Sequence, residues 1–363
     1  MTNRERERQT LNFGRPEGRG AVEETFYPWD LTLMRFVEEG LPRELADPIT
    51  SRKEPEEERY LRAGWGEGVL ALETYLGFDP VRRIKLVVPV LGEADGSRPL
   101  VRGWEDWKKK KEEAEREIEQ SFSQKAIERV YGSLVERHER GEFSLRMNLE
   151  GFFWIPRELL GIEEHLYAFY DEPKLLHEIN SFVLKFYETW LGRILEVVQP
   201  DVVYLQEDLS GKNGPMISPE FFEEFVGDYY RKLIPQMKAA GVENVFVDTD
   251  GDFKKLIPNF MAAGVDGFLP MDVNAGMDIN EVRAEFPALK LIGSFNKLRI
   301  AEGREAIDQE FQRLLPVIRQ GGYLPGTDHQ VAPSTSLEHY RYYIRRLQEA
   351  MQEAGTEAKR LGG

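Results

Sequence analysis

The amino-acid sequence predicts an α/β fold, a (β/α)8 TIM-type barrel with an N-terminal excursion. From residue 143 onward, short apolar runs alternate with amphipathic helical segments that mostly end in glycine, which is the pattern of parallel βαβ units. Several apolar runs also end abruptly in carboxylates. The run 245–247, for example, is followed by Asp248, Thr249 and Asp250. Residues at that position of a parallel barrel line its mouth, where its chemistry takes place.

The expected strands follow one another along a single domain, residues 1–363. The first is residues 21–27, which come after a charged, glycine-rich start. Residues 28–142 are expected to form an irregular, partly helical excursion that holds an eighth strand, with 83–91 as a strand or hairpin arm and 104–119 as a solvent-facing helix. The later strands are expected at 143–147, 202–205, 245–247, 267–269, 289–292 and 322–324. Eight strands favour a closed barrel over an open doubly wound sheet.

Composition excludes several classes of function. The 363 residues include no cysteine, so disulfides, thiolate nucleophiles and cysteine-ligated zinc are excluded. A formal net charge of -16 argues against nucleic acid as a partner. No stretch approaches the roughly 18 apolar residues that cross a bilayer, and the N-terminus lacks a secretory signal, so we expect a cytoplasmic protein without membrane contact. No glycine-rich phosphate-binding motif follows any expected strand, which weakens a nucleotide-binding alternative.

Titratable side chains follow three of the expected strands. Because the carboxyl ends of parallel strands meet at one face of a barrel, we expect these groups to converge. The candidate catalytic residues are Asp248, Glu207 and His329. The candidate ligands of zinc or another divalent cation are Asp248, Asp250, His329 and Glu207, and Asp208 and Asp328 lie beside them. The alternatives are that the carboxylates cap helices or brace loops and that His329 is a structural hydrogen-bonding residue.

Candidate substrate-binding residues also lie near strand ends. Phe26, Tyr27 and Trp29 would form an apolar wall suited to a planar substrate, and their alternative is a place in the core. Asn148 ends the strand 143–147. Lys297 follows the strand 289–292, where it could bind an anionic group or pair with a neighbouring aspartate.

Three segments together resemble the uroporphyrinogen decarboxylase superfamily. They are Gly-Pro-Met-Ile-Ser-Pro-Glu-Phe-Phe at 214–222, Asp-Thr-Asp-Gly at 248–251, and Gly-Gly-Tyr-Leu-Pro at 321–325 with Asp328 and His329. The resemblance covers residues 143–350, and the start of the chain at residues 2–11 fits as well. It implies a TIM barrel and one of two activities, tetrapyrrole decarboxylation or methyl transfer that involves corrinoid proteins.

Two departures from the family patterns distinguish these branches. True decarboxylases carry Met-Arg-Gln-Ala-Gly-Arg after the first strand, where this chain has Phe-Tyr-Pro-Trp-Asp at residues 26–30. Without an arginine fork, a substrate with many carboxylates would be poorly bound. Thiol methyltransferases of the family hold zinc with a His-x-Cys pair and a later cysteine, and this chain has Asp248-Thr249-Asp250 and 327–329 at those positions.

The resemblance is therefore nearer the corrinoid-dependent methyltransferase or O-demethylase branch. It implies an enzyme that moves a methyl group from a small methoxylated or methylated compound to the cobalt of a corrinoid (cobalamin). The chain has no Asp-x-His-x-x-Gly motif, so the corrinoid would arrive on a separate corrinoid protein. The alternatives are a decarboxylase of a carboxylated tetrapyrrole and a barrel that binds a tetrapyrrole or corrinoid without turnover. Since members of the superfamily can be dimeric, a homodimer is also expected.

Overall fold

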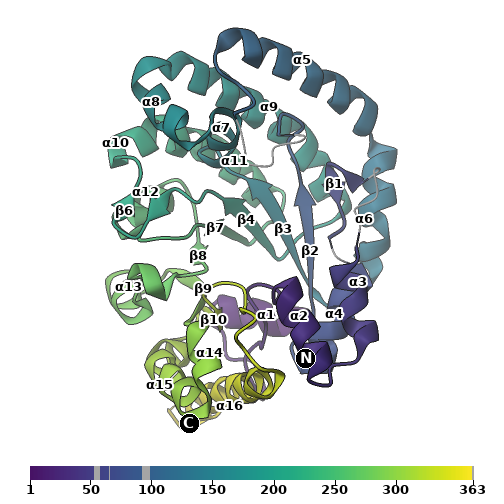
Figure 1. Cartoon of the computed structure of the whole chain (residues 1–363), viewed down its shortest axis with the longest axis vertical. Coiled ribbons are helices and arrows are strands. Elements are labelled where there is room, and N and C mark those ends of the chain that lie inside the picture. Colours follow the sequence, from purple (N-terminus) through teal and green to yellow (C-terminus); the bar gives the residue numbers. More distant parts are fainter. Residues whose placement is uncertain (53–57, 65, 92–98, 362–363) are drawn as a thin grey trace.

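The protein is built on one sheet of eight strands (Figure 1), in the hydrogen-bonded order β1-β2-β3-β4-β7-β8-β9-β10. The computed structural model describes residues 1–52, 58–64, 66–91 and 99–361. All neighbouring strands from β2 to β10 are parallel, and β1 pairs antiparallel with β2. The strands are β1 Leu61–Arg62, β2 Val81–Leu86, β3 Ser144–Glu150, β4 Val202–Gln206, β7 Asn244–Asp248, β8 Gly267–Leu269, β9 Lys290–Phe295 and β10 Tyr323–Thr327.

Helices surround the strands (Figure 1), and at least one helix lies between each two consecutive parallel strands of the sheet, as expected for βαβ units. They are α1 Asn3–Leu11, α2 Asp30–Glu38, α3 Arg43–Thr50, α4 Gly66–Leu76, α5 Trp104–Ser121, α6 Gln124–Glu139, α7 Trp154–Leu160, α8 Ile162–Asp171, α9 Pro173–Val197, α10 Pro219–Phe222, α11 Asp228–Ala239, α12 Ile257–Ala262, α13 Ile279–Glu285, α14 Leu298–Glu302, α15 Arg304–Gln320 and α16 Leu337–Leu361. A small hairpin, β5 Ser210–Gly211 and β6 Gly214–Pro215, follows β4, and the single turns η2 Glu223–Gly227, η3 Lys254–Leu256 and η4 Val273–Ala275 complete the connections. The helix predicted at 104–119 is confirmed as α5.

The prediction of a first strand at 21–27 is wrong, although the segment lies where that strand would be. Residues 21–25 run between β2 and β10 without a regular ladder. The Val22 carbonyl accepts the Asp79 N–H at 2.7 Å, on the β2 side, and the Glu24 carboxylate accepts the Thr327 N–H at 2.9 Å, on the β10 side. One backbone bond and one side-chain bond stand here in place of a regular ladder. The segment therefore joins the first and last parallel strands without being a strand itself. The eighth strand expected within residues 28–142 is β2.

The inside of the barrel is a separate apolar cluster. It is formed by alternate strand residues together with Leu11 of α1 and Ala21; the strand residues are Val202, Tyr204, Phe246, Leu269, Ile292 and Leu324. The residues between them, such as Val203 and Val247, pack outward against the helices. Both faces of each strand are therefore buried, which explains the nearly continuous apolar runs in the sequence.

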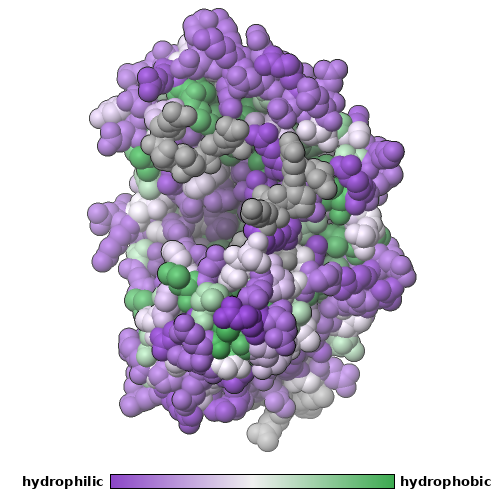
Figure 2. Space-filling view, turned by 45° about the vertical axis from the view of Figure 1, so that its right-hand side comes forward, coloured by the Kyte–Doolittle hydropathy of each residue, from purple (hydrophilic) through white to green (hydrophobic). Residues whose placement is uncertain are grey.

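The outer surface is largely hydrophilic. Figure 2 shows one face of the molecule, on which hydrophilic residues predominate and a hollow opens near the middle. Among the described residues, no helix combines the length and the apolar character that a membrane crossing requires.

A buried ionic network ties α1 and the segment 21–25 to the barrel interior. The Arg146 guanidinium donates to the Tyr204 hydroxyl at 2.7 Å and to the Glu7 carboxylate at 3.1 Å, and it also pairs with Glu23. Arg146, Glu7 and Glu23 are all almost completely buried. Burial and the negative charge of Glu7 raise the pKa of Glu23, and Arg146 opposes that rise. The guanidinium is thus what keeps two buried carboxyls compatible with folding.

Replacement of Arg146 by alanine is expected to destabilise the fold strongly. The substitution leaves Glu7 and Glu23 without their cation in a dry interior, a loss of about 3–5 kcal/mol for buried pairs. Urea unfolding followed by circular dichroism would measure it. Arg140→Ala, which removes exposed surface pairs, should cost no more than about 1 kcal/mol. Equal midpoints for Arg146→Ala and the unsubstituted protein would contradict the role assigned to this network.

Candidate active site at the barrel mouth

The ends of four strands meet at the mouth of the barrel through their polar side chains. The Asp208 carboxylate, after β4, accepts the Asp250 N–H at 3.3 Å from the segment after β7. His329 Nε2, after β10, lies 3.9 Å from Asp250 Oδ2. The Asp328 carboxylate accepts the Asn274 side-chain N–H at 3.1 Å from η4, after β8. The predicted convergence of acidic groups and one imidazole therefore holds for Asp208, Asp248, Asp250, Asp328 and His329.

Three carboxyls crowd the ends of β4 and β7. β4 and β7 pair with Gln206 opposite Asp248, and the Glu207 N–H donates to the Asp248 carbonyl at 2.9 Å, so the two strand ends are fixed side by side. Burial, followed by the repulsion of Asp208 and Asp250, raises the pKa of Asp248 well above its usual range, and Lys85 opposes the rise. The pKa of Asp208 is raised for the same reasons. Burial and the two neighbouring carboxylates therefore both favour the protonated form of Asp248.

The β9 and β10 side of the mouth is held by a second buried carboxylate. Asp328 is 1% exposed, and its oxygens accept the Lys297 N–H at 3.0 Å and the Asn274 amide N–H. Burial raises the pKa of Asp328 to about 6. Burial and the positive charge of Lys297 lower the pKa of His329, which makes the imidazole neutral at pH 7. A neutral imidazole beside Asp250 can donate or accept a hydrogen bond.

Glu207 is fixed by other contacts. Its carboxylate is fully buried and accepts the N–H groups of residues 152–154 at 3.1, 2.9 and 3.0 Å, together with the Tyr230 hydroxyl. Burial raises the pKa of Glu207 to about 7 even though these donors oppose the rise. The carboxylate lies at the N-terminus of α7, where it pairs with otherwise unsatisfied N–H groups. This geometry assigns Glu207 the task of holding the β3–α7 connection.

The four predicted metal ligands do not form one ligand set. Glu207 is occupied by four donors, and the nearest approach between His329 and Asp250 is 3.9 Å. No group of three or more His, Asp or Glu side chains among the described residues is arranged to hold a metal ion.

The predicted substrate-binding residues divide into two groups. The Phe26 ring lies 5.4 Å from the His329 ring, and Lys297 acts electrostatically on Asp250 and Asp328, so both border the mouth. Tyr27 instead accepts a hydrogen bond from Arg83, whose guanidinium lies 4.6 Å from the tyrosine ring centre, and Trp29 is 48% exposed at the start of α2.

Asn148 lies inside the barrel below the acidic residues. In the parallel register it stands opposite Tyr204, which faces the interior, and opposite Lys85. Its amide oxygen is buried and accepts no hydrogen bond from the described residues. An amide oxygen without a donor in such a place is suited to a ligand that donates one.

Sequence reasoning missed Lys85 and Asn274. Lys85 Nζ lies 3.1 Å from the Glu150 carboxylate and lowers the pKa of Asp248. The expected strand at 83–91 begins later than β2, which obscured the alternation that turns Lys85 inward. Asn274 lies in η4, capped by Asp272, and no pattern before the fold marks it as a neighbour of Asp328.

The fold and the site together define a parallel α/β barrel with a titratable mouth formed by strand ends. A family model described as uroporphyrinogen decarboxylase (URO-D) matches residues 98–350, more than half of the chain. The chain therefore belongs to the uroporphyrinogen decarboxylase family, as the sequence motifs predicted, and the predicted TIM-type barrel is confirmed.

Two solved structures are similar to this chain. A methyltransferase from Methanosarcina mazei aligns over 96% of this chain and 99% of its own, with a TM-score of 0.61 and 13% identity, which establishes a shared fold. A B12-independent methionine synthase from Shewanella sp. W3-18-1, in complex with selenomethionine, aligns over 62% of this chain and 64% of its own, with a TM-score of 0.34 and 12% identity, too distant to bear on the argument. No curated protein matches the chain.

Glu207→Gln is expected to destabilise the folded protein by about 2–4 kcal/mol, because a glutamine presents an N–H₂ group to donors that need an acceptor. Chemical denaturation would measure the loss. The control is Glu163→Gln on the exposed first turn of α8, which should stay within about 0.5 kcal/mol. A Glu207→Gln protein of unchanged stability but without activity would instead make Glu207 a catalytic group.

Asp248→Asn is expected to become more stable than the unsubstituted protein as pH rises. In the unfolded chain Asp248 ionises at its ordinary pKa, whereas in the folded chain its pKa is raised. The unsubstituted protein therefore loses stability as pH rises from about 4, the ordinary pKa of an aspartate, toward the raised folded-state pKa. Thermal unfolding of both proteins between pH 4 and 8 would show the difference widen with pH. A difference that stays constant over this pH range would contradict the raised pKa of Asp248.

Proposed function

We propose that this protein is a methyltransferase of the O-demethylase type, which moves a methyl group from a small methoxylated or methylated compound to the cobalt of a corrinoid on a separate protein. The observation that carries the proposal is the crowding of Asp208, Asp248 and Asp250 at the adjacent ends of β4 and β7, which, with burial, raises the pKa of the Asp248 carboxyl. A methyl ether is a poor electrophile because its leaving oxygen takes up negative charge. A neutral acid beside that oxygen supplies a proton as the charge develops.

The bond changes balance without a further reactant. A reduced corrinoid, when brought by its partner protein, would supply the electron pair for the new bond to the methyl carbon. The methyl–oxygen bond breaks with its electron pair remaining on oxygen, and that oxygen takes the proton from Asp248. Asp208 and Asp250 act on this step through Asp248, because their charges keep its proton bound until the leaving oxygen becomes more basic than the carboxylate.

The remaining side chains of the mouth position a substrate. Phe26, packed on the neutral His329, offers an apolar edge to a methoxylated ring. The buried Asn148 oxygen would accept a hydrogen bond from a hydroxyl group of the same ring. Lys297 stands beside Asp250 and Asp328, where it moderates the negative charge of the mouth.

The charge of the mouth favours a neutral substrate over a polycarboxylate. Five aspartates gather there, at positions 208, 248, 250, 272 and 328, and Lys85 is already paired with Glu150. The nearby arginines serve other partners: Arg157 donates to the Asp208 carbonyl, and Arg83 to Glu73 and the Glu24 carbonyl. A tetrapyrrole carrying several carboxylates would meet repulsion without an arginine fork. The similarity in fold to a methyltransferase from Methanosarcina mazei also supports methyl transfer.

Decarboxylation of a carboxylated tetrapyrrole is the second candidate, since the matching family model carries that description. A protonated carboxyl could also deliver the proton that replaces carbon dioxide. The two reactions differ in their products, so one experiment can separate them.

Asp248→Asn is expected to lower kcat by at least about 100-fold with methoxylated aromatic substrates, because the amide can donate a hydrogen bond but cannot release a proton. Free cob(I)alamin serves as the methyl acceptor, with its absorbance recording its consumption and chromatography recording the demethylated phenol. The loss should shrink for substrates with electron-withdrawing ring substituents, whose phenolates leave without protonation. Asp228→Asn, an exposed aspartate on α11, is the control and should keep full activity.

Two outcomes would overturn the proposal. Unchanged turnover in Asp248→Asn would remove the general acid on which it rests. Release of carbon dioxide from a porphyrinogen, without methyl transfer from any methoxylated compound, would establish the second candidate.

A further inference from the structure

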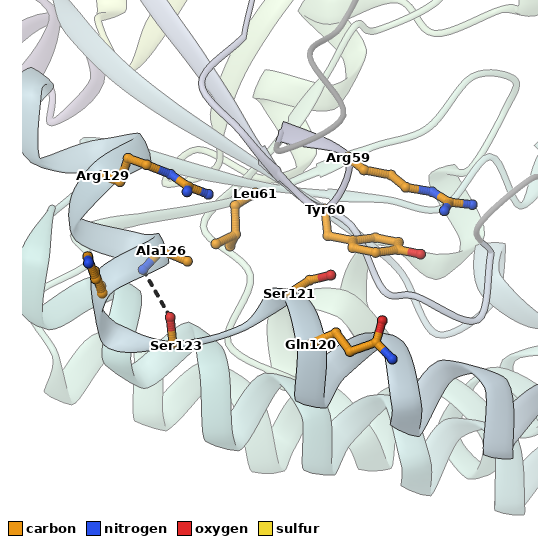
Figure 3. Close-up of a pocket in the computed structure, with 9 residues that line it drawn as sticks. Arg59, Tyr60, Leu61, Gln120, Ser121, Ser123, Ala126 and Arg129 are labelled. Atoms are coloured by element: carbon orange, nitrogen blue, oxygen red, sulfur yellow. Dashed lines mark hydrogen bonds between the residues drawn. The ribbon is translucent and has the colours of Figure 1, made fainter.

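A cavity of about 400 Å³ lies between β1 and the junction of α5 and α6 (Figure 3). Its walls come from the residues that lead into β1, the end of α5 and the first turns of α6, where Ser123 caps the helix. None of its lining residues belongs to the apolar cluster inside the barrel or to the barrel mouth. This cavity is therefore separate from the candidate active site, where the inward-facing cation Lys85 still lacks a role.

Lys85 lies on the inner face of β2 and is accessible from the mouth. In the parallel register it stands opposite Asn148, which stands opposite the inward-facing Tyr204. Tyr204 is 6% exposed, whereas the Lys85 side chain is 29% exposed and Asn148 is half-buried. Because these two side chains face the interior and are still partly exposed, the hollow of the mouth reaches down to their layer.

One ion pair fixes the Lys85 ammonium in the mouth. Its Nζ lies 3.1 Å from Oε1 of Glu150, its ion-pair partner within the part of the chain that the structure describes. Glu150 is 4% exposed, and its Oε2 accepts the Val88 N–H at 3.1 Å, so this carboxylate is itself held in place. An ammonium has three N–H donors, and one carboxylate oxygen engages one of them. The ammonium is therefore positioned with donors left for a ligand.

The charge of Lys85 acts on both strand ends beside it. Burial and the repulsion of Asp208 and Asp250 raise the pKa of Asp248, and Lys85 opposes that rise. Burial also raises the pKa of Glu158 on α7, and Lys85 is one of the cations that oppose it. The ammonium is therefore within electrostatic reach of the end of β7 and of the helix that follows β3.

Loss of the Asp248 proton adds a negative charge to a place that is already acidic. During transfer this charge is shared by the Asp248 carboxylate and the leaving oxygen, and a buried charge requires a partner. Two other cations near the mouth bear on different groups. Lys297 acts on Asp250 and Asp328, and Arg157 donates to the Asp208 carbonyl at 2.8 Å. Lys85 is the cation that acts on Asp248.

We propose that the Lys85 ammonium donates a hydrogen bond to the leaving oxygen of the substrate, as a second donor beside the Asp248 carboxyl. This role rests on the methyl transfer proposed above. The methyl–oxygen bond breaks with its electron pair remaining on oxygen, and Asp248 transfers one proton to that oxygen. Lys85 keeps all of its protons and stabilises the negative charge while the transfer is incomplete.

The first test compares Lys85→Met, Glu150→Gln and the double variant in the cob(I)alamin assay with methoxylated aromatic substrates. Lys85→Met is expected to lower kcat at least about tenfold, because a charged donor to the developing oxyanion is lost. The double variant should show the same loss although it leaves no buried charge unpaired, since glutamine can still accept the Val88 N–H. Glu150→Gln keeps the ammonium and should lose much less. Lys109→Gln, on the exposed surface of α5, is the control and should keep full activity.

The second test uses 4-nitrophenol, a coloured analogue of the phenol product, and does not require turnover. A hydrogen bond from a charged donor favours the phenolate, so 4-nitrophenol bound to the unsubstituted protein should ionise at least about one pH unit lower than when bound to Lys85→Met. Absorbance of the phenolate during a pH titration at saturating protein would measure both midpoints. Circular dichroism would verify that each variant is folded.

Three results would refute the role of Lys85. They are an unchanged kcat in Lys85→Met, activity restored in the double variant, which would make Lys85 only the partner of Glu150, and equal ionisation midpoints or no saturable binding of 4-nitrophenol. If the unsubstituted protein transfers methyl groups, each of these results refutes Lys85 alone and leaves the proposed function in place. An unsubstituted protein that transfers no methyl group would instead refute the proposed function, and the role of Lys85 would fall with it.

Discussion

The candidate active site depends on the confinement of like-charged carboxyls at the ends of β4 and β7. The register of these strands brings Asp208, Asp248 and Asp250 together, and water is partly excluded from them. Such a cluster opposes folding at neutral pH, because each carboxyl would be ionised in the unfolded chain. The apolar interior beneath it and the Arg146 network offset that cost. Electrostatic strain of this kind raises the pKa of Asp248 and makes this aspartate a candidate general acid.

Carboxylates around the mouth have two different tasks, and hydrogen bonding distinguishes them. Glu207 and Asp328 are buried and accept backbone N–H groups from neighbouring connections, so they hold those connections in place. Asp248 makes no such contact through its carboxyl among the described residues, and its environment acts on it by burial and charge alone. A rigid frame made by the first group is needed to keep the second group close together despite its repulsion.

The sequence was sufficient for the fold and for the place of the site, and insufficient for the roles within it. Short apolar runs ending in carboxylates recur because parallel strands are buried on both faces and open at one end, so the position of Asp248 and His329 followed from local pattern. Glu207 has the same local pattern, yet its partners lie more than fifty residues earlier, at 152–154, where no periodicity indicates contact. The prediction of a strand at 21–27 was wrong for a related reason. The side chains of Asp79 and Glu24 make hydrogen bonds that the backbone of a neighbouring strand would otherwise make.

The charge of the barrel mouth bears on which substrates can reach it. The mouth gathers aspartates at positions 208, 248, 250, 272 and 328. A single anionic substrate with many carboxylates would need cations inside the mouth. Of the basic residues of β2 that turn inward, Lys85 is held by Glu150 and Arg83 by Glu73. Family membership alone leaves this open, since one barrel supports several reactions according to its strand ends. Here the strand ends combine a carboxyl whose pKa is raised, an imidazole whose pKa is lowered and an aromatic edge. That combination suits departure of an uncharged substrate's oxygen.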